Sequence, residues 1–192
     1  TTENRHGIGC IKVDITAVEH QQFRHLSKIR QILEESSLDA DIISRSLQVF
    51  SEIARAEAKV HDIDIEQVHF HEVGAIDTII DVVGVIAGLH YLGIEKLHCA
   101  AVPSPQGFVS CAHGILPLPA PAVCEILKDV PCYGTDIRHE LVTPTGAALI
   151  KTLSCEFGPM PPMTITSTGY GAGSHKLSNG QPNLFRLIVG KP

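Results

Sequence analysis

The chain has 192 residues, of which 44% are hydrophobic and 19% are charged, so we expect a folded, soluble protein rather than a disordered one. Its formal net charge of -6 gives no basic footprint for nucleic acid, and no run of about 18 apolar residues could span a membrane. The six cysteines form no CxxC pair, which argues against a zinc knuckle and a thioredoxin-like motif. No signal peptide is present, so reduced thiols and a cytoplasmic location are expected. The first residue is Thr rather than Met, and we expect a fragment of a longer protein.

The first third of the chain predicts one strand and two amphipathic helices. Residues 8–15 alternate weakly, as a strand does. Residues 25–36 and 39–60 repeat apolar side chains at intervals of three and four, which is the spacing of a helix with one buried face. A polar link follows at residues 61–67. We place a domain boundary there, so that residues 1–67 form an N-terminal strand and two-helix part.

A group of imidazoles and carboxylates follows the link, at residues 69–81. On an extended segment His69 and His71 point to the same side, and Glu72 comes next. Asp77 and Asp81 are four residues apart, so on a helix they share one face. Such a strand-to-helix corner suits a divalent metal of the nickel, zinc or manganese kind. The alternatives are that Asp77 caps the helix and that the histidines are ordinary core residues.

The helix that carries the two aspartates, residues 75–90, is apolar nearly all round, which predicts an interior helix. Gly84 and Gly88 continue the stripe of Asp77 and Asp81. A glycine inside a helix costs about 1 kcal/mol relative to alanine, so we expect something to pack closely there. That neighbour could be this chain or a second subunit, and a homo-oligomer therefore stays among the alternatives.

Residues 68–192 predict a mixed α/β part, and the fold class predicted for the whole chain is α+β. Strand patterns occupy residues 97–102, 108–112, 130–133, 163–168 and 184–189. One helix is expected from Pro121 to Lys128. Another is expected to begin after a Thr143 cap, with Pro144 at its first position, and to reach about Glu156.

A thiol and an imidazole offer further chemistry near the middle of the chain. Cys111 and His113 are two residues apart at a strand end, which suits metal ligation or a nucleophile with its base. The alternative is a buried cysteine beside a turn histidine.

A possible anion site lies later in the chain. Glu140 precedes the helix start at Thr143, Thr145 and Gly146, where free N–H groups can bind phosphate or carboxylate. Residues 169–174 are rich in glycine but open no βαβ unit, so a dinucleotide fingerprint is not indicated. A tight turn near a ligand and a β-bulge are the alternatives for that segment.

Several of these motifs together resemble the LarC family, the pyridinium-3,5-bisthiocarboxylic acid mononucleotide nickel insertion proteins. The resemblance runs from about residue 25 to the end of the chain. In chain order the motifs are residues 69–77 (HFHEVGAID), 111–114 (CAHG), 117–121 (PLPAP), 140–146 (ELVTPTG), 157–162 (FGPMPP) and 169–173 (GYGAG).

The resemblance implies that nickel is inserted into an organic ligand to make the nickel-pincer nucleotide cofactor of lactate racemase-type enzymes. The reaction is a cyclometallation, in which nickel is bound by two thiocarboxylate sulfurs and a pyridinium ring carbon. The family uses CTP and manganese, which we expect a C-terminal domain absent from this chain to bind. The enzyme class expected is a CTP-dependent cyclometallase of the lyase class. Its partners would be a small-molecule nucleotide substrate and its own C-terminal domain, but no nucleic acid and no membrane.

The predicted roles follow from these residues. We expect His69, His71 and Glu72 to bind nickel, with Asp77 as a further ligand or an orienting residue. Glu72, Asp81 or His113 would accept the ring proton. The substrate phosphate could rest on the helix start at residues 143–146. The alternatives are a non-catalytic nickel-binding module that needs the C-terminal domain, and a metal-dependent hydrolase in which the same ligands activate water.

Overall fold

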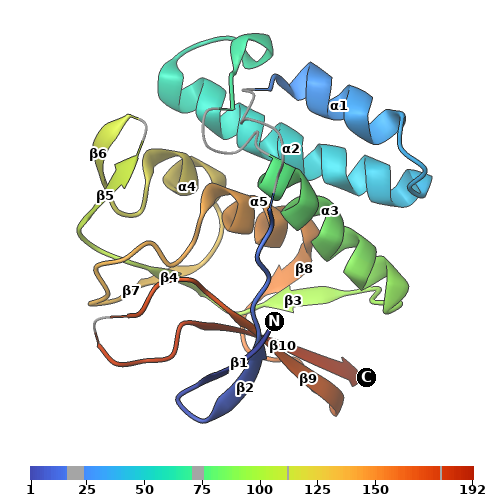
Figure 1. The fold of residues 1–192 in the computed structure, drawn as a ribbon, viewed down its shortest axis with the longest axis vertical. Helices are drawn as coiled ribbons and strands as arrows, with labels where there is room; N and C mark the ends of the chain where they lie inside the picture. Colours follow the sequence, from blue (N-terminus) through green and yellow to red (C-terminus); the bar gives the residue numbers. More distant parts are fainter. Residues whose placement is uncertain (17–23, 71–75, 112, 178) are drawn as a thin grey trace.

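The computed structural model describes residues 1–16, 24–70, 76–111, 113–177 and 179–192. Its helices gather at one end of the molecule and a four-stranded sheet lies at the other, with short strand pairs between them (Figure 1). Both chain ends lie beside the sheet. This mixed arrangement confirms the predicted α+β class.

The long helix α2 (Ala40–His61) is the centre of the helical layer. It packs against α1 (Leu26–Glu34), α3 (Ile76–Tyr91), α4 (Pro121–Ile126) and α5 (Pro144–Leu153). Val49, Phe50 and Ile53 recur at helical spacing and are fully buried, as the sequence pattern predicts. The ring of Phe50 meets Phe70 edge-to-face, with centroids 6.5 Å apart.

The core joins both parts of the chain that the sequence divides at residue 67. Ile29, Leu33 and the buried face of α2 share one hydrophobic cluster with Val68, Phe70 and residues of α3, α4 and α5. The short 3-10 helix η1 (Ile65–Gln67) links the two, and Asp64 accepts a hydrogen bond from the Glu66 N–H at its start. The domain boundary itself stays a prediction.

Helix α3 is less buried than its composition predicts. Thr78, Val82, Ile86 and Leu89 form one buried stripe, while Ile80 and Val85 on the outer face are 46% and 42% exposed. Among the described elements, the main neighbours of α3 are α2 and α5, which cover its buried stripe. A Cβ built on Gly84 or Gly88 meets no described neighbour within 4 Å, so the close packing expected there is not found within this part of the chain.

Three small strand pairs complete the fold. β3 (Leu97–Cys99) pairs in parallel with β8 (Ser154–Phe157), and β4 (Val102–Ser104) with β7 (Cys132–Gly134). β5 (Phe108–Cys111) and β6 (Gly114–Pro117) form an antiparallel hairpin. The β3–β8 and β4–β7 pairs lie between the helices and the large sheet, and β5–β6 lies beside α4 (Figure 1). The helix expected to reach Glu156 ends at Leu153, because the next residues form strand β8, in which Ser154, Glu156 and Phe157 pair with β3.

The large sheet has the order β1-β2-β9-β10. It consists of β1 (Thr2–Arg5), β2 (Ile8–Ile11), β9 (Thr164–Ala172) and β10 (Leu184–Lys191). The glycine-rich segment is mostly strand, since Gly169 and Gly171 pair with Leu187 and Phe185 of β10. The register of this pair shifts between Val189 and Gly190 of β10, opposite which β9 has the extra residue Thr166.

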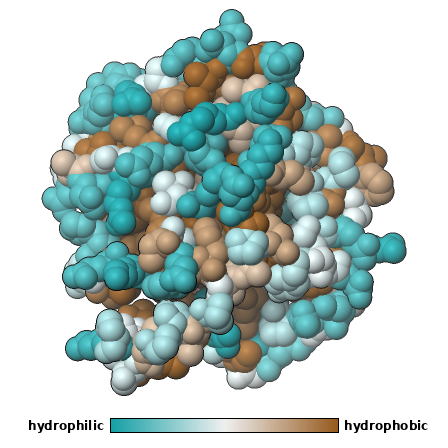
Figure 2. Space-filling view, turned by 180° about the vertical axis from the view of Figure 1, so that it is seen from behind, coloured by the Kyte–Doolittle hydropathy of each residue, from teal (hydrophilic) through white to brown (hydrophobic). Residues whose placement is uncertain are grey.

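The surface carries apolar patches between hydrophilic areas (Figure 2). Phe108 and Ile115 on the β5–β6 hairpin are 71% and 74% exposed. None of the described helices combines the length and the apolarity that crossing a bilayer requires.

Candidate metal centre

The segment that enters the predicted metal site is held by its neighbours on both sides in the sequence. Val68 and Phe70 are both 2% exposed, whereas His69 between them is exposed. The Phe70 N–H donates to the Arg24 carbonyl oxygen at 3.3 Å, forming an isolated antiparallel bridge. Because side chains alternate on extended backbone, burying Val68 and Phe70 turns His69 outward.

The bridge brings His69 against a histidine from the start of α1. The ring centroids of His25 and His69 are 4.0 Å apart, and the rings are tilted by 50°. His25 Nδ1 lies 3.2 Å from the Val68 carbonyl oxygen, which can only accept, so Nδ1 carries the proton and donates. The neutral ring then keeps its Nε2 lone pair. Histidines that bind metals commonly donate their other N–H to a backbone carbonyl in this way.

Sequence reasoning missed His25 as a site residue. No spacing rule connects it with His69, because the two meet only through the bridge between Arg24 and Phe70. The other two predicted ligands of this motif, His71 and Glu72, lie outside the described residues. Whether His71 shares the outward side with His69 therefore stays a prediction.

The two aspartates of α3 lie on its exposed side. Asp77 is in the first turn, and its Oδ1 accepts a hydrogen bond from the Thr78 N–H at 2.8 Å. Asp81 follows one turn later. Although the residue is exposed, partial desolvation raises the pKa of the Asp81 carboxyl, and the negative charge of Asp77 raises it further.

The described residues alone do not assemble a complete metal site. Within residues 1–16, 24–70, 76–111, 113–177 and 179–192, no three His, Cys, Asp or Glu side chains are grouped so that they could hold a metal ion. The structure thus shows the His25–His69 pair and the Asp77–Asp81 pair, each of which supplies part of a ligand set.

His113 lies at the tip of the β5–β6 hairpin, against the end of α2. Its ring centroid is 4.8 Å from that of His61, the last residue of α2. His61 Nε2 in turn lies 3.4 Å from a carboxylate oxygen of Glu57. Cys111 ends β5 on the same hairpin and is partly buried. The sequence did not indicate the pairing of His113 with His61, which lies across the fold.

The start of α5 has the geometry that the sequence predicts. Thr143 is the N-cap, its Oγ1 accepts from the Gly146 N–H at 3.1 Å, and Pro144 is at the first position. The Ala147 N–H donates to the Thr143 carbonyl oxygen. Pro144 has no N–H, so Thr145 alone keeps an uncommitted backbone donor in this turn. Glu140 is partly buried in the loop before the helix.

A thiol, an imidazole and a carboxylate meet across the β3–β8 pair, where the sequence indicated no site. Cys155 Sγ lies 3.8 Å from His98 Nε2, and His98 Nδ1 lies 3.5 Å from a Glu156 carboxylate oxygen. Cys155 also donates to the Leu97 carbonyl oxygen at 3.2 Å. The parallel register, which pairs His98 with Glu156, produces this cluster.

Comparison with known proteins shows the family. The family model described as nickel insertion protein matches residues 1–192, and the chain belongs to that family. This confirms the resemblance found in the motifs. A relative from Desulfotalea psychrophila is 55% identical over 186 residues, which are 97% of this chain and 48% of that relative.

Two other relatives carry a more specific name. A pyridinium-3,5-bisthiocarboxylic acid mononucleotide nickel insertion protein of Desulfitobacterium hafniense is 46% identical over 187 residues, 97% of this chain and 46% of that protein. One of the same name from Acetivibrio thermocellus is 49% identical over 177 residues, 91% of this chain and 43% of that protein. The chain thus spans about half the length of these relatives. No solved structure matches it.

Proposed function

We propose that this chain takes part in inserting nickel into pyridinium-3,5-bisthiocarboxylic acid mononucleotide. Membership of the nickel insertion family and the names of the relatives support the reaction and the substrate. The contact between His25 and His69 supports placing the nickel site at the corner before α3. Imidazole is a good ligand for nickel, and His25 has the protonation pattern that a ligating histidine needs.

In this proposal nickel is the cargo, and the ligands hold it until the substrate takes it. His69, His71 and Glu72 bind the ion, His25 completes the imidazole set, and Asp77 binds or orients from α3. Carboxylates provide exchangeable bonds for a hard or borderline ion. Exchangeable ligands suit an ion that must leave for two thiocarboxylate sulfurs and a ring carbon.

The metal–carbon bond forms as the ring carbon loses its proton. Nickel enters as the dication, the carbon–hydrogen bond breaks heterolytically, and its electron pair forms the nickel–carbon bond. A base of the protein takes the proton. Glu72, Asp81 and His113 are the candidates for this base. Replacing each one and measuring the rate of proton loss from the substrate would identify which of them accepts the proton.

CTP and manganese belong to the proposed activity of the whole protein, as a CTP-dependent cyclometallase. Within the described residues, no three His, Cys, Asp or Glu side chains are grouped as ligands for such a metal. A second candidate function is a nickel-binding module that reacts only together with a CTP-binding C-terminal domain. Activity of the 192-residue chain alone, given CTP and the unmetallated substrate, would exclude that module.

Nickel calorimetry on a double variant tests the ligand assignment. His69→Ala with His71→Ala should abolish nickel binding while leaving the helical circular dichroism signal unchanged. His90→Ala is the matched control, because His90 is an exposed imidazole at the far end of α3, 3.6 Å from Asp39 and 3.8 Å from Asp41. A folded double variant that binds nickel as tightly as the control would refute the assignment.

A further inference from the structure

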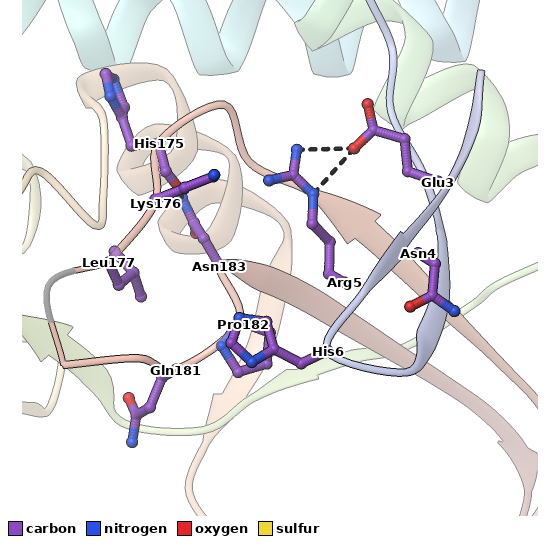
Figure 3. Close-up of a pocket in the computed structure, with 10 residues that line it drawn as sticks. All are labelled: Glu3, Asn4, Arg5, His6, His175, Lys176, Leu177, Gln181, Pro182 and Asn183. Carbon is purple, nitrogen blue, oxygen red and sulfur yellow. Dashed lines mark hydrogen bonds and ion pairs between the residues drawn. The ribbon is translucent and has the colours of Figure 1, made fainter.

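A half-open cavity of about 560 Å³ lies at the large sheet, and none of the predicted metal ligands lines it. Its walls are the turn between β1 and β2 on one side and the connection between β9 and β10 on the other (Figure 3). The volume is within the range of roughly 300–1,000 Å³ that small-molecule sites occupy. The large sheet therefore has room for a ligand of nucleotide size.

The charges in this cavity favour an anion, although the chain as a whole carries -6. Arg5 is paired with Glu3, whose Oε2 accepts from Nε at 2.9 Å and lies 2.7 Å from a terminal guanidinium nitrogen. The Lys176 ammonium points across the cavity toward the Arg5 guanidinium (Figure 3). In the part of the chain that the structure describes, Lys176 has no ion-pair partner. The two cations thus exceed the one carboxylate, and an anion between them would be attracted by both.

Hydrogen bonds connect described residues within each wall of the cavity. Asn183 Nδ2 donates to the His175 carbonyl oxygen at 3.1 Å, and the Gly173 N–H donates to the Asn183 carbonyl oxygen at 3.0 Å. A Cβ on Gly173 would overlap the Asn183 amide group, so the glycine permits this clamp. On the opposite wall, the Gly7 N–H donates to Asn4 Oδ1 at 2.8 Å. A site held in this way loses less entropy when it binds a ligand.

The cavity is also connected to the loop that the sequence singled out for anion binding. His175, which lines the cavity, stacks on His139 with ring centroids 6.1 Å apart and an interplanar angle of 8°. His139 directly precedes Glu140. The start of α5 beyond that loop offers one uncommitted N–H, at Thr145, because Thr143 caps the others. A phosphate therefore finds more positive charge between Arg5 and Lys176 than at the helix start.

We propose that this cavity binds the phosphate monoester of the mononucleotide substrate between Arg5 and Lys176. The assignment rests on the proposed function, because it takes the substrate named for the relatives as its ligand. Lys176 acts as a point charge on the phosphate, and Arg5 adds its planar donor group.

The test uses calorimetry on the 192-residue chain with nicotinic acid mononucleotide, a pyridinium carboxylate mononucleotide, as the probe. Its riboside, which lacks the phosphate, and CTP are measured alongside. We expect the mononucleotide to bind at least about tenfold more tightly than the riboside, and Lys176→Gln to weaken its binding by about tenfold or more. Lys176→Arg should keep most of the affinity, and Lys191→Gln, an exposed lysine at the end of β10, should change nothing.

Three outcomes would overturn the proposal. They are equal binding of riboside and mononucleotide, unchanged affinity in a folded Lys176→Gln variant, and tighter Lys176-dependent binding of CTP, which would assign the cavity to a triphosphate. Nickel binding of the same variants separates this proposal from the nickel site. If the His69 and His71 variants still bind nickel while the mononucleotide binds as expected, only the nickel assignment is refuted. If nickel binds as expected but the mononucleotide does not bind, only the cavity assignment is refuted.

Discussion

His25 should contribute to nickel binding although no sequence motif includes it. Its Nδ1–H donates to the Val68 carbonyl oxygen at 3.2 Å, and its ring lies 4.0 Å from that of His69. His25→Gln removes an imidazole that lies against the His69 ring and whose Nε2 lone pair can bind a metal. Loss of a residue that ligates or orients at a metal site typically costs 10–100-fold in affinity, which is about 1.4–2.7 kcal/mol.

The same substitution should have a smaller effect on stability. It removes one partly buried hydrogen bond, worth about 0.5–1.5 kcal/mol. Calorimetric titration with nickel gives the affinity, and urea unfolding of the metal-free protein gives the stability. His90→Gln serves as the control for losing an imidazole, because its contacts with Asp39 and Asp41 are exposed ion pairs of little energetic value.

A folded His25→Gln variant that binds nickel with the affinity of the unmodified chain would refute the role of His25. If His69→Gln nevertheless weakens nickel binding, His25 is only the N-cap residue of α1 and not a nickel ligand. If neither substitution has an effect, the corner before α3 is not the nickel site.

Gly190→Ala should lower the free energy of unfolding by about 1–3 kcal/mol, because its Cβ would lie 2.8 Å from both a methionine sulfur and the first carbonyl oxygen of β9. Gly9→Ala in β2 is the control, because a Cβ there meets nothing described within 4 Å. Equal urea midpoints of the two variants would contradict this prediction. Asp81→Asn should stabilise the protein by about 0.2–0.5 kcal/mol at pH 7. The pKa of Asp81 is raised in the folded state, so its ionised carboxyl destabilises the fold fully above the raised pKa and not at all below the usual value of 3.8. The increase in melting temperature caused by Asp81→Asn should therefore disappear in acid. Iodoacetamide should modify Cys155, which is exposed, faster than Cys99, because burial raises the pKa of the Cys99 thiol and lowers its thiolate fraction; mass spectrometry of the peptides checks the order.

The sequence was sufficient to predict those elements whose structure depends on their own residues alone. The apolar spacing of α2 and the Thr143–Pro144 start of α5 are local signals, and both are confirmed. The end of α5 was predicted three residues too late, because the choice between helix and strand at residues 154–157 depends on β3, more than fifty residues away. The exposed face of α3 was missed for a related reason, since composition gives the hydrophobicity of a helix but not the number of its neighbours.

The candidate site shows the same division between local and distant information. The outward direction of the His69 side chain could be predicted, because Val68 and Phe70 on either side of it are apolar and buried. His25, His61 and the His98–Cys155–Glu156 cluster could not, since each depends on a pairing between distant segments. The cavity between Arg5 and Lys176 joins the two ends of the chain, and no local motif marks it.

Removing nickel should leave the fold intact. The core around α2 consists of apolar residues such as Phe50 and Ile53, and the Arg24–Phe70 bridge positions the site segment without a metal. Nickel then stabilises only by mass action, by about 2.7 kcal/mol when its free concentration is a hundred times the dissociation constant. This differs from a structural zinc site, whose loss unfolds the domain. EDTA should therefore lower the unfolding midpoint while the helical circular dichroism signal at 25 °C stays constant. Collapse of that signal on chelation would show that the metal is part of the core, and a transferable ion bound near exposed His69 would then be the wrong description.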